Sequence, residues 1–107
     1  MTVHLLKTAP AHFCAVASGE KKAEWRRDDR SPRFQVGHRI VLASWARGSW
    51  RGPAILCRVS HISRGRSGHP NEIPAGFAVL SLEIVECFER GAAGSWGIVA
   101  EREGWTR

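Results

Sequence analysis

The spacing of apolar residues predicts one short helix near the start of the chain, from Thr8 to Gly19. Phe13, Val16 and Ala17 recur at the i, i+3, i+4 spacing that brings side chains onto one face of a helix. Thr8 is a candidate N-cap, and Gly19 can end the helix in a left-handed conformation. We expect the apolar face of this helix to pack on a sheet.

Beyond this helix, short extended segments alternate with turns rich in Gly, Pro and Ser. Ile55, Cys57 and Val59 alternate with other side chains, which is typical of a strand with one wetter face. The sequences RGSWRGP and SRGRSGHPNEIPAG indicate a hairpin turn and a long loop. The predicted strands cover residues 22–27, 38–45, 54–62 and 77–85.

These elements predict an α+β, mostly β domain. Short strands with one or two short helices are typical of a small closed or half-closed β-barrel, in which few strand edges remain exposed. A chain of 107 residues fits a single domain. We expect this domain to cover residues 1–87, and residues 88–107 to form a C-terminal extension that is a docking arm, an extra strand or a partly disordered segment.

Charge is distributed unevenly along the chain, whose formal net charge is +6. Residues 1–70 contain 13 Lys or Arg and 4 Asp or Glu, whereas residues 71–107 contain 3 and 6. Because 13 of the 16 cations are Arg, whose planar group binds phosphate and stacks on bases, the composition favours RNA or a nucleotide as partner. A soluble Arg-rich surface without such a partner explains the same composition.

Cysteine usage and apolar content favour a cytoplasmic protein. Cys14, Cys57 and Cys87 are odd in number and far apart, so we expect reduced, mostly buried thiols. No segment approaches the roughly 20 apolar residues of a membrane-spanning helix, so we expect no membrane partner. The histidines lack the spacing of a zinc site, and we expect neither a metal nor a cofactor.

The charged segment SGEKKAEWRRDDR, residues 18–30, is the main candidate for a site. In a strand, Lys22, Glu24 and Arg26 lie on one face, and a bulge after the preceding glycine would bring Lys21 to that face as well. Lys21, Glu24 and Arg26 together can hold a phosphate or a base edge. A charged edge strand that prevents aggregation explains the same pattern.

The same segment resembles a known family. Gly19, Lys21, Glu24 and Arg26 reproduce the signature G-x-K-x-x-E-x-R of the ASCH family, whose members have a PUA-like β-barrel fold. The runs DDRSPRFQVGHRIVL and VLSLE that follow are similar to a small prokaryotic and phage subgroup of that family. The resemblance covers about residues 3–86.

The resemblance implies a role connected with nucleic acids, because PUA-like and ASCH domains are associated with RNA binding. Some ASCH proteins are ribonucleases or amidohydrolases of acetylated cytidine, and the amidohydrolases use a Lys, a Thr and a downstream Glu. Lys21 matches this Lys, but Glu24 occupies the Thr position, which counts against the amidohydrolase reaction. Glu72 is the only carboxylate near the position of the downstream acid, and His38 stands where the subgroup usually has Asp.

Other candidates lie outside the charged segment. Trp50, between two arginines in a predicted turn, is the best candidate to stack on an unpaired base, whereas we expect Trp25 and Trp45 in the core. Arg64 and Arg66 lie in a Gly-containing loop and would extend the basic surface by binding an anion. A flexible basic loop is the alternative for both arginines.

Three functions therefore remain open, of which we favour the first. It is binding of RNA or a nucleotide in a basic cleft, with the candidate binding residues Lys21, Glu24, Arg26, Trp50, Arg64 and Arg66. The second is a small hydrolase acting on RNA or a modified nucleoside, with Lys21 and Glu24 as catalytic residues and Glu72 as a further candidate. The third is a protein-interaction module that docks a partner through the Trp-rich extension.

Overall fold

The computed structural model describes residues 2–66 and 73–88, which form mostly β-structure with one short helix. The elements in chain order are β1 (Val3–Thr8), α1 (Pro10–Ala17), β2 (Ala23–Arg27), β3 (Arg39–Ala46), β4 (Ser49–Arg64) and β5 (Phe77–Phe88). The predicted fold class, α+β and mostly β, is confirmed. Residues 89–107, nearly all of the predicted C-terminal extension, lie outside the described residues.

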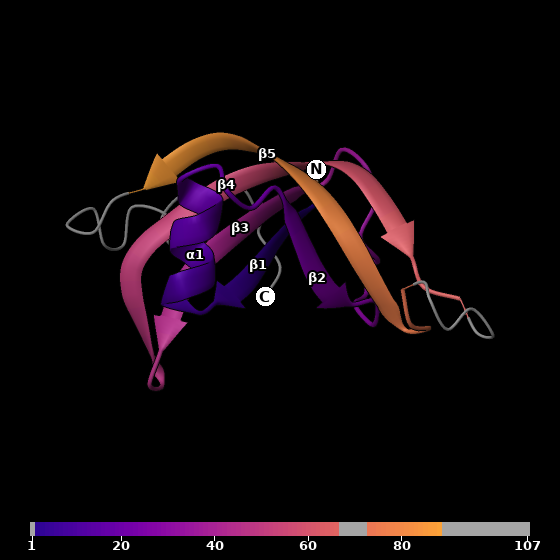
Figure 1. Cartoon of the computed structure of the whole chain (residues 1–107), viewed down its shortest axis with the longest axis horizontal. Helices are drawn as coiled ribbons and strands as arrows, with labels where there is room; N and C mark the ends of the chain where they lie inside the picture. The colour runs from indigo at the N-terminus through magenta and orange to yellow at the C-terminus, as the bar shows by residue number, and fades with distance from the viewer. Residues whose placement is uncertain (1, 67–72, 89–107) are drawn as a thin grey trace.

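The strands form one sheet in the order β1-β3-β4-β5-β2. β1 pairs with β3 in parallel, and the other neighbours are antiparallel. Figure 1 shows the long strands β4 and β5 arching over the shorter strands β1 and β2, so that the sheet curls into a half-barrel. β1 and β2 are the two edges of this half-barrel.

The curl has a local cause in the pairing of β4 with β5. The register of this pair shifts between Leu56 and Cys57, and again between Val59 and His61. An extra residue in one strand of an antiparallel pair bends that strand and increases its twist. The two shifts therefore turn the ends of the sheet toward each other.

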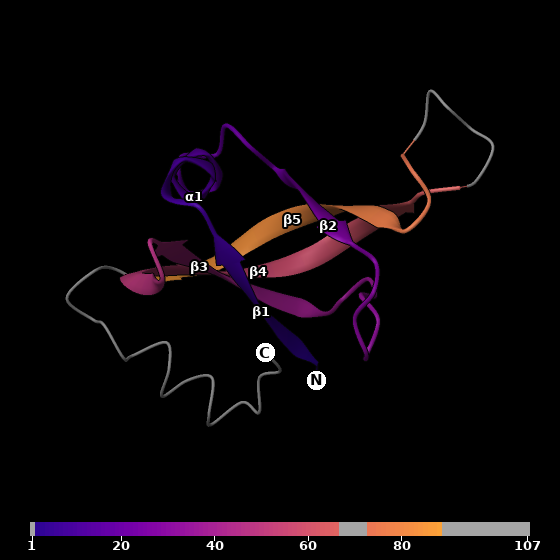
Figure 2. The same ribbon diagram turned by 90° about the horizontal axis from the view of Figure 1, so that it is seen from below.

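Helix α1 lies on one side of the sheet (Figure 2). Two of its apolar side chains anchor it: Phe13 and Val16 are buried, as their spacing predicted, but Ala17 is exposed. The predicted N-cap is wrong, because Thr8 is the last residue of β1. The N-cap residue is Ala9, and it makes no side-chain capping bond.

Strand β1 was not predicted, because it lacks the alternation that identifies a half-buried strand. Its first four residues, from Val3 to Leu6, are all buried. Val3 and Leu5 pack in a core cluster on one face of the sheet, and Leu6 packs in a second cluster on the other face. A strand that is covered on both faces shows a continuous apolar run rather than alternating polar and apolar residues.

The core occupies both faces of the sheet. Ile55, Cys57 and Val59 have 0% exposure and belong to the cluster beneath α1, so their predicted common face is confirmed. Leu56, expected on the wetter face, is also buried, in the cluster on the opposite face. The sheet therefore has apolar packing above and below its central strands.

The expectation for the cysteines holds only in part. Cys57 is buried, and burial raises the pKa of its thiol to about 12. Cys14 and Cys87 are exposed, which corrects the expectation that the thiols are mostly buried. As for membranes, the described part of the chain contains no helix that is long and apolar enough to span one.

Candidate functional site

The half-barrel is open between β1 and β2, and arginine side chains bridge this opening, which we call the mouth. Arg26 of β2 donates from Nη2 to the carbonyl oxygen of Lys7 at 2.9 Å and to Oγ1 of Thr8 at 3.3 Å. Arg30 donates from Nη2 to the carbonyl oxygen of Leu5 at 3.5 Å. Because an edge strand has unpaired backbone groups, these donors compensate for the partner strand that β1 lacks on this side.

Lys21, Glu24 and Arg26 meet at the mouth, and we call them the mouth cluster. Oε2 of Glu24 accepts from Nζ of Lys21 at 3.2 Å, and Oε1 accepts from Nε of Arg26 at 3.1 Å. The side chain of Glu24 is only 7% exposed, whereas those of Lys21 and Arg26 are 30% and 25% exposed. One buried carboxylate thus holds two cations that remain accessible to a ligand.

The turn after α1 and the phase of β2 explain how these side chains meet. Gly19 adopts the predicted left-handed conformation, with φ of 83°, and the backbone N–H of Lys21 donates to the carbonyl oxygen of Ala15 at 2.9 Å. Lys21 therefore lies in a turn before β2 begins. Glu24 and Arg26 are alternate residues of β2 and share a face.

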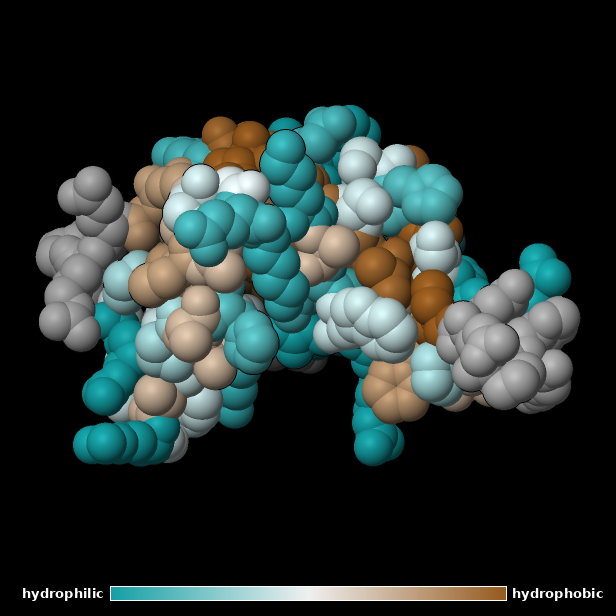
Figure 3. Space-filling model, viewed as in Figure 1, coloured by the Kyte–Doolittle hydropathy of each residue, from teal (hydrophilic) through white to brown (hydrophobic). Residues whose placement is uncertain are grey.

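A pocket of about 320 Å³, the mouth pocket, opens beside the mouth cluster. Trp25 contributes to its wall and is 55% exposed, so the prediction that Trp25 lies in the core is wrong. In the space-filling view, hydrophilic side chains gather between α1 and β2 (Figure 3). The lining residues are Lys7, Thr8, Ala9, His12, Lys21, Glu24, Trp25 and Arg26.

A second pocket of about 570 Å³, the tryptophan pocket, shares Lys7 and Arg26 with the mouth pocket. Trp45 and Trp50 contribute to its wall, with ring centroids 4.7 Å apart and ring planes at 79°. Trp50 lies in β4, paired with Trp45 of β3, and not in the turn where it was predicted. Trp45 is half-buried at this pocket, which corrects its predicted place in the core.

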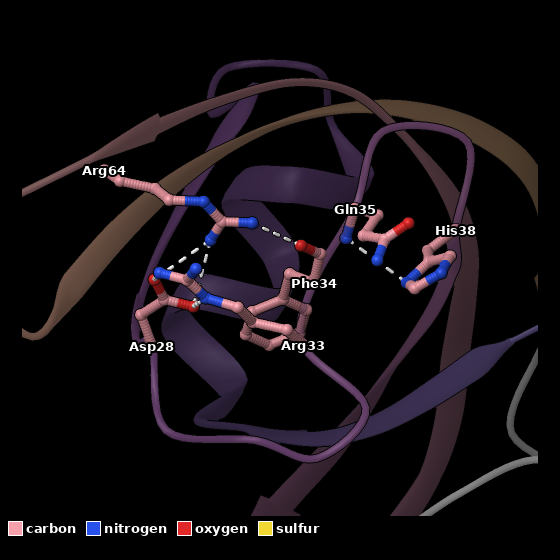
Figure 4. A network of polar contacts seen from close by, with 6 residues as sticks. All are labelled: Asp28, Arg33, Phe34, Gln35, His38 and Arg64. Carbon is pink, nitrogen blue, oxygen red and sulfur yellow. Dashed lines mark hydrogen bonds and ion pairs between the residues drawn. The ribbon is translucent and has the colours of Figure 1, made fainter.

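Asp28, Arg33 and Arg64 form a different cluster of charges, which we call the loop cluster (Figure 4). The nearly buried carboxylate of Asp28 accepts from Nη2 of Arg33 at 2.6 Å and from Nη1 of Arg64 at 2.9 Å. Nη2 of Arg64 donates to the carbonyl oxygen of Phe34. The hydrogen bond from Arg33 lowers the pKa of Asp28; burial opposes this shift, and Arg64 adds to it.

The structure therefore does not bring all predicted site residues together. Arg64 belongs to the loop cluster, so it does not extend the basic surface beside Lys21 as expected. Arg66 is exposed beyond the end of β4, and Glu72 lies outside the described residues. Within the described ranges, no group of three or more His, Cys, Asp or Glu side chains could hold a metal ion.

A histidine pair close to the mouth was not predicted. His4 of β1 is 1% exposed, and its Nε2 lies 3.1 Å from Nδ1 of His38. Nδ1 of His38 also accepts a hydrogen bond from the backbone N–H of Gln35 at 3.2 Å (Figure 4), so His38 caps the turn between these two residues. Because this Nδ1 is therefore an acceptor, the contact between the histidines is a hydrogen bond that His4 donates to His38. Burial lowers the pKa of His4 to about 4, and the positive charge of Arg30 contributes.

Two comparisons relate the chain to known proteins. The uncharacterized 12.9 kDa protein in the GpA 3′ region of Escherichia phage P2 is 28% identical over 61 residues, which are 57% of this chain and 54% of the phage protein. The chain thus spans about half the length of this relative. Residues 3–82, which include the mouth cluster and the loop cluster, match the model of the domain of unknown function DUF3850, and the chain belongs to this family.

Proposed function

We propose that this domain binds single-stranded RNA or a nucleotide at the mouth and is related to the ASCH and PUA-like domains that its signature resembles. The observation that carries the proposal is the mouth pocket, which Lys21 and Arg26 line and to whose wall Trp25, a 55% exposed residue, also contributes. Surfaces that bind single strands combine aromatic rings, on which bases stack, with cations that contact phosphates. The mouth offers both.

The charge around the mouth supports an anionic ligand. Lys7, Lys21 and Arg26 line the mouth pocket, and Glu24 is the one carboxylate among its described lining residues. A concave surface with excess positive charge attracts a polyanion and concentrates it locally. The partner that suits this charge is a phosphate-bearing ligand.

The contacts of Glu24 favour binding over hydrolysis. Each of its oxygens already accepts a hydrogen bond, one from Lys21 and one from Arg26. A general base must be within reach of a substrate proton, and protonation of Glu24 would weaken both contacts. Glu24 instead orients the two cations, which lowers the entropy that they lose on binding phosphate.

Binding of a labelled short single-stranded RNA, followed by fluorescence anisotropy over a series of salt concentrations, tests the proposal. Trp25→Ala should weaken binding by about tenfold, because stacking contributes roughly 1–3 kcal/mol per base. Lys21→Ala should reduce the slope of log K against log salt by about 0.7, the contribution of one phosphate contact on a single strand.

Lys22→Ala is the matched control, because Lys22 is the adjacent cation and does not line the mouth pocket. It should leave the slope nearly unchanged. Equal losses of RNA affinity in Lys21→Ala and Lys22→Ala would mean that binding depends on the total charge of the protein and not on a site at the mouth. The absence of salt-dependent binding by the unmodified chain would reject the function, and RNA cleavage that disappears in Glu24→Gln would favour the hydrolase instead.

A further inference from the structure

The tryptophan pocket is suited to a ligand of its own. Its volume of about 570 Å³ lies within the roughly 300–1,000 Å³ of small-molecule sites. Lys7, Arg26 and Arg30 line it, whereas Glu24 lines the neighbouring mouth pocket. Among the described lining residues, the charged groups of this pocket are therefore three cations without a carboxylate.

Arg30, which lines this pocket, carries a buried and unsatisfied hydrogen-bond donor. Its Nη1 atom is buried and has no partner among the described residues, and its Nη2 atom is 3.5 Å from the carbonyl oxygen of Leu5, a long hydrogen bond. Burial and the charge of Arg26 lower the pKa of Arg30, and the charge of Asp29 opposes this shift. An anionic group in the pocket would offset the charge of Arg30.

Aromatic and apolar side chains complete the pocket. The pairing of β3 with β4 is irregular between Ala43 and Trp45, and beyond this irregularity Trp45 pairs with Trp50. Nζ of Lys7 lies 4.0 Å from the centre of the Trp45 ring and so covers one face of this indole, which leaves the other surface of the ring for a base. With the two leucines of β1 that also line the pocket, these indoles offer apolar surface for a flat ring beside the cations.

We propose that the tryptophan pocket is a subsite for a single unpaired nucleotide, with its base against Trp45 and its phosphate bound by Arg30. This inference rests on the nucleic-acid or nucleotide binding proposed above and names the part of the ligand that is recognised. The nucleotide belongs either to a single strand whose neighbouring phosphates follow the mouth cluster or to a free nucleoside monophosphate. In both cases the pocket accepts an unpaired base, because its apolar wall has to contact the face of that base.

The test is a titration of the full chain, labelled with ¹⁵N at tryptophan, with AMP and with adenosine, read by NMR at the indole N–H signals. AMP should shift the signals of Trp45 and Trp50 and bind about tenfold more tightly than adenosine, because one charge-assisted hydrogen bond contributes roughly that factor. Arg30→Gln should remove most of the preference for AMP over adenosine and leave the affinity for adenosine unchanged. Trp45→Leu should weaken both ligands about tenfold.

Arg27→Gln is the matched control, since Arg27 lies on the exposed face of β2 and does not line this pocket. Arg30→Lys keeps the charge without the guanidinium fork and should retain part of the preference for AMP. Unshifted Trp45 and Trp50 signals, or equal losses of AMP and adenosine in Arg30→Gln, would overturn the subsite.

The RNA titration separates this inference from the proposed function. If RNA binding depends on Trp25 and Lys21 but is unaffected by Arg30→Gln and Trp45→Leu, the mouth binds RNA and the subsite is rejected. If RNA does not bind while AMP shifts the Trp45 signal in an Arg30-dependent manner, the pocket is a site for free nucleotides and the strand-binding function is rejected. The subsite within a strand is supported if Arg30→Gln and Trp45→Leu both weaken RNA binding, and if replacing one nucleotide of the RNA by an abasic one causes no further loss of affinity in these variants.

Discussion

The mouth cluster and the loop cluster have the same arrangement of charges and very different surroundings. Each consists of a nearly buried carboxylate, Glu24 or Asp28, between two partly exposed cations. In the mouth cluster, Arg26 lines both the tryptophan pocket and the mouth pocket, and Lys21 lines the mouth pocket. In the loop cluster, Arg64 directs both of its terminal nitrogens to partners within the fold, Asp28 and the carbonyl oxygen of Phe34.

The difference shows that an ion-pair network is not by itself evidence of a binding site. The loop cluster connects the segment after β2 to the end of β4, two parts of the chain that are far apart in sequence. The ion pairs of the mouth cluster join neighbouring residues of one turn and strand, and only its Arg26 also reaches a distant element, β1, among the contacts of the described residues. We therefore assign the loop cluster to stability and the mouth cluster to ligand binding, and the following substitutions test this division.

Asp28→Ala should produce the largest loss of stability. Removing one partner of a buried ion pair costs about 3–5 kcal/mol, and because Arg33 and Arg64 are 59% and 31% exposed, we expect about 2–3 kcal/mol. Urea unfolding followed by circular dichroism measures the change. RNA affinity of the folded protein should be unchanged.

Asp29→Ala is the control for this change, because Asp29 is the adjacent carboxylate and is exposed. Its effect should remain within about 0.5 kcal/mol. Equal stability losses in the two variants, or a loss of RNA affinity in Asp28→Ala while the protein is folded, would contradict the assignment of the loop cluster to stability.

His4 extends the comparison to a buried group that has no counter-charge. Between its unfolded pKa of 6.5 and its folded pKa of about 4, the unfolded chain binds a proton at His4 that the folded chain excludes. The free energy of unfolding should therefore fall as the pH falls through this window, by up to about 1.4 kcal/mol per pH unit. Burial also lowers the pKa of the adjacent His38, which acts in the same direction.

The measurement is the difference between the unfolding free energies of the unmodified chain and of His4→Gln at neutral pH and at about pH 5. The variant should lose stability at neutral pH but show a shallower dependence on pH. His61→Gln, which alters an exposed histidine, is the control and should keep the original dependence. Parallel pH curves for His4→Gln and the unmodified chain would contradict the role of His4.

The smallest expected effect distinguishes the arginines of the two clusters. Arg26→Gln should weaken RNA binding several-fold, because it removes a cation that lines both the mouth pocket and the tryptophan pocket. Arg64→Gln should leave RNA binding nearly unchanged and lower the free energy of unfolding, because it removes the ion pair with Asp28. Anisotropy and urea unfolding on the same protein samples measure the two effects. The reverse result, with RNA affinity lost in Arg64→Gln and kept in Arg26→Gln, would exchange the functions of the clusters.

Most of the mouth cluster could be predicted from the sequence because its contacts are local. The two-residue period of β2 places Glu24 and Arg26 on one face, and Gly19 permits the turn that brings Lys21 to them. The exposure of Trp25 could not be predicted in the same way. Apolar character favours burial, but whether a side chain on an edge strand is covered depends on what packs against that strand.

The sequence by itself determined the fold class, the helix anchored by Phe13 and Val16, and the phases of β2 and β4, because periodicity depends only on local geometry. Only the tertiary structure decided which faces meet. The register shifts of β4 and β5 curl the sheet until β2 reaches β1, and the order of the strands brings Arg26 to Lys7 and Arg64 to Asp28. These two contacts depend on long-range pairing and burial, which no local pattern encodes.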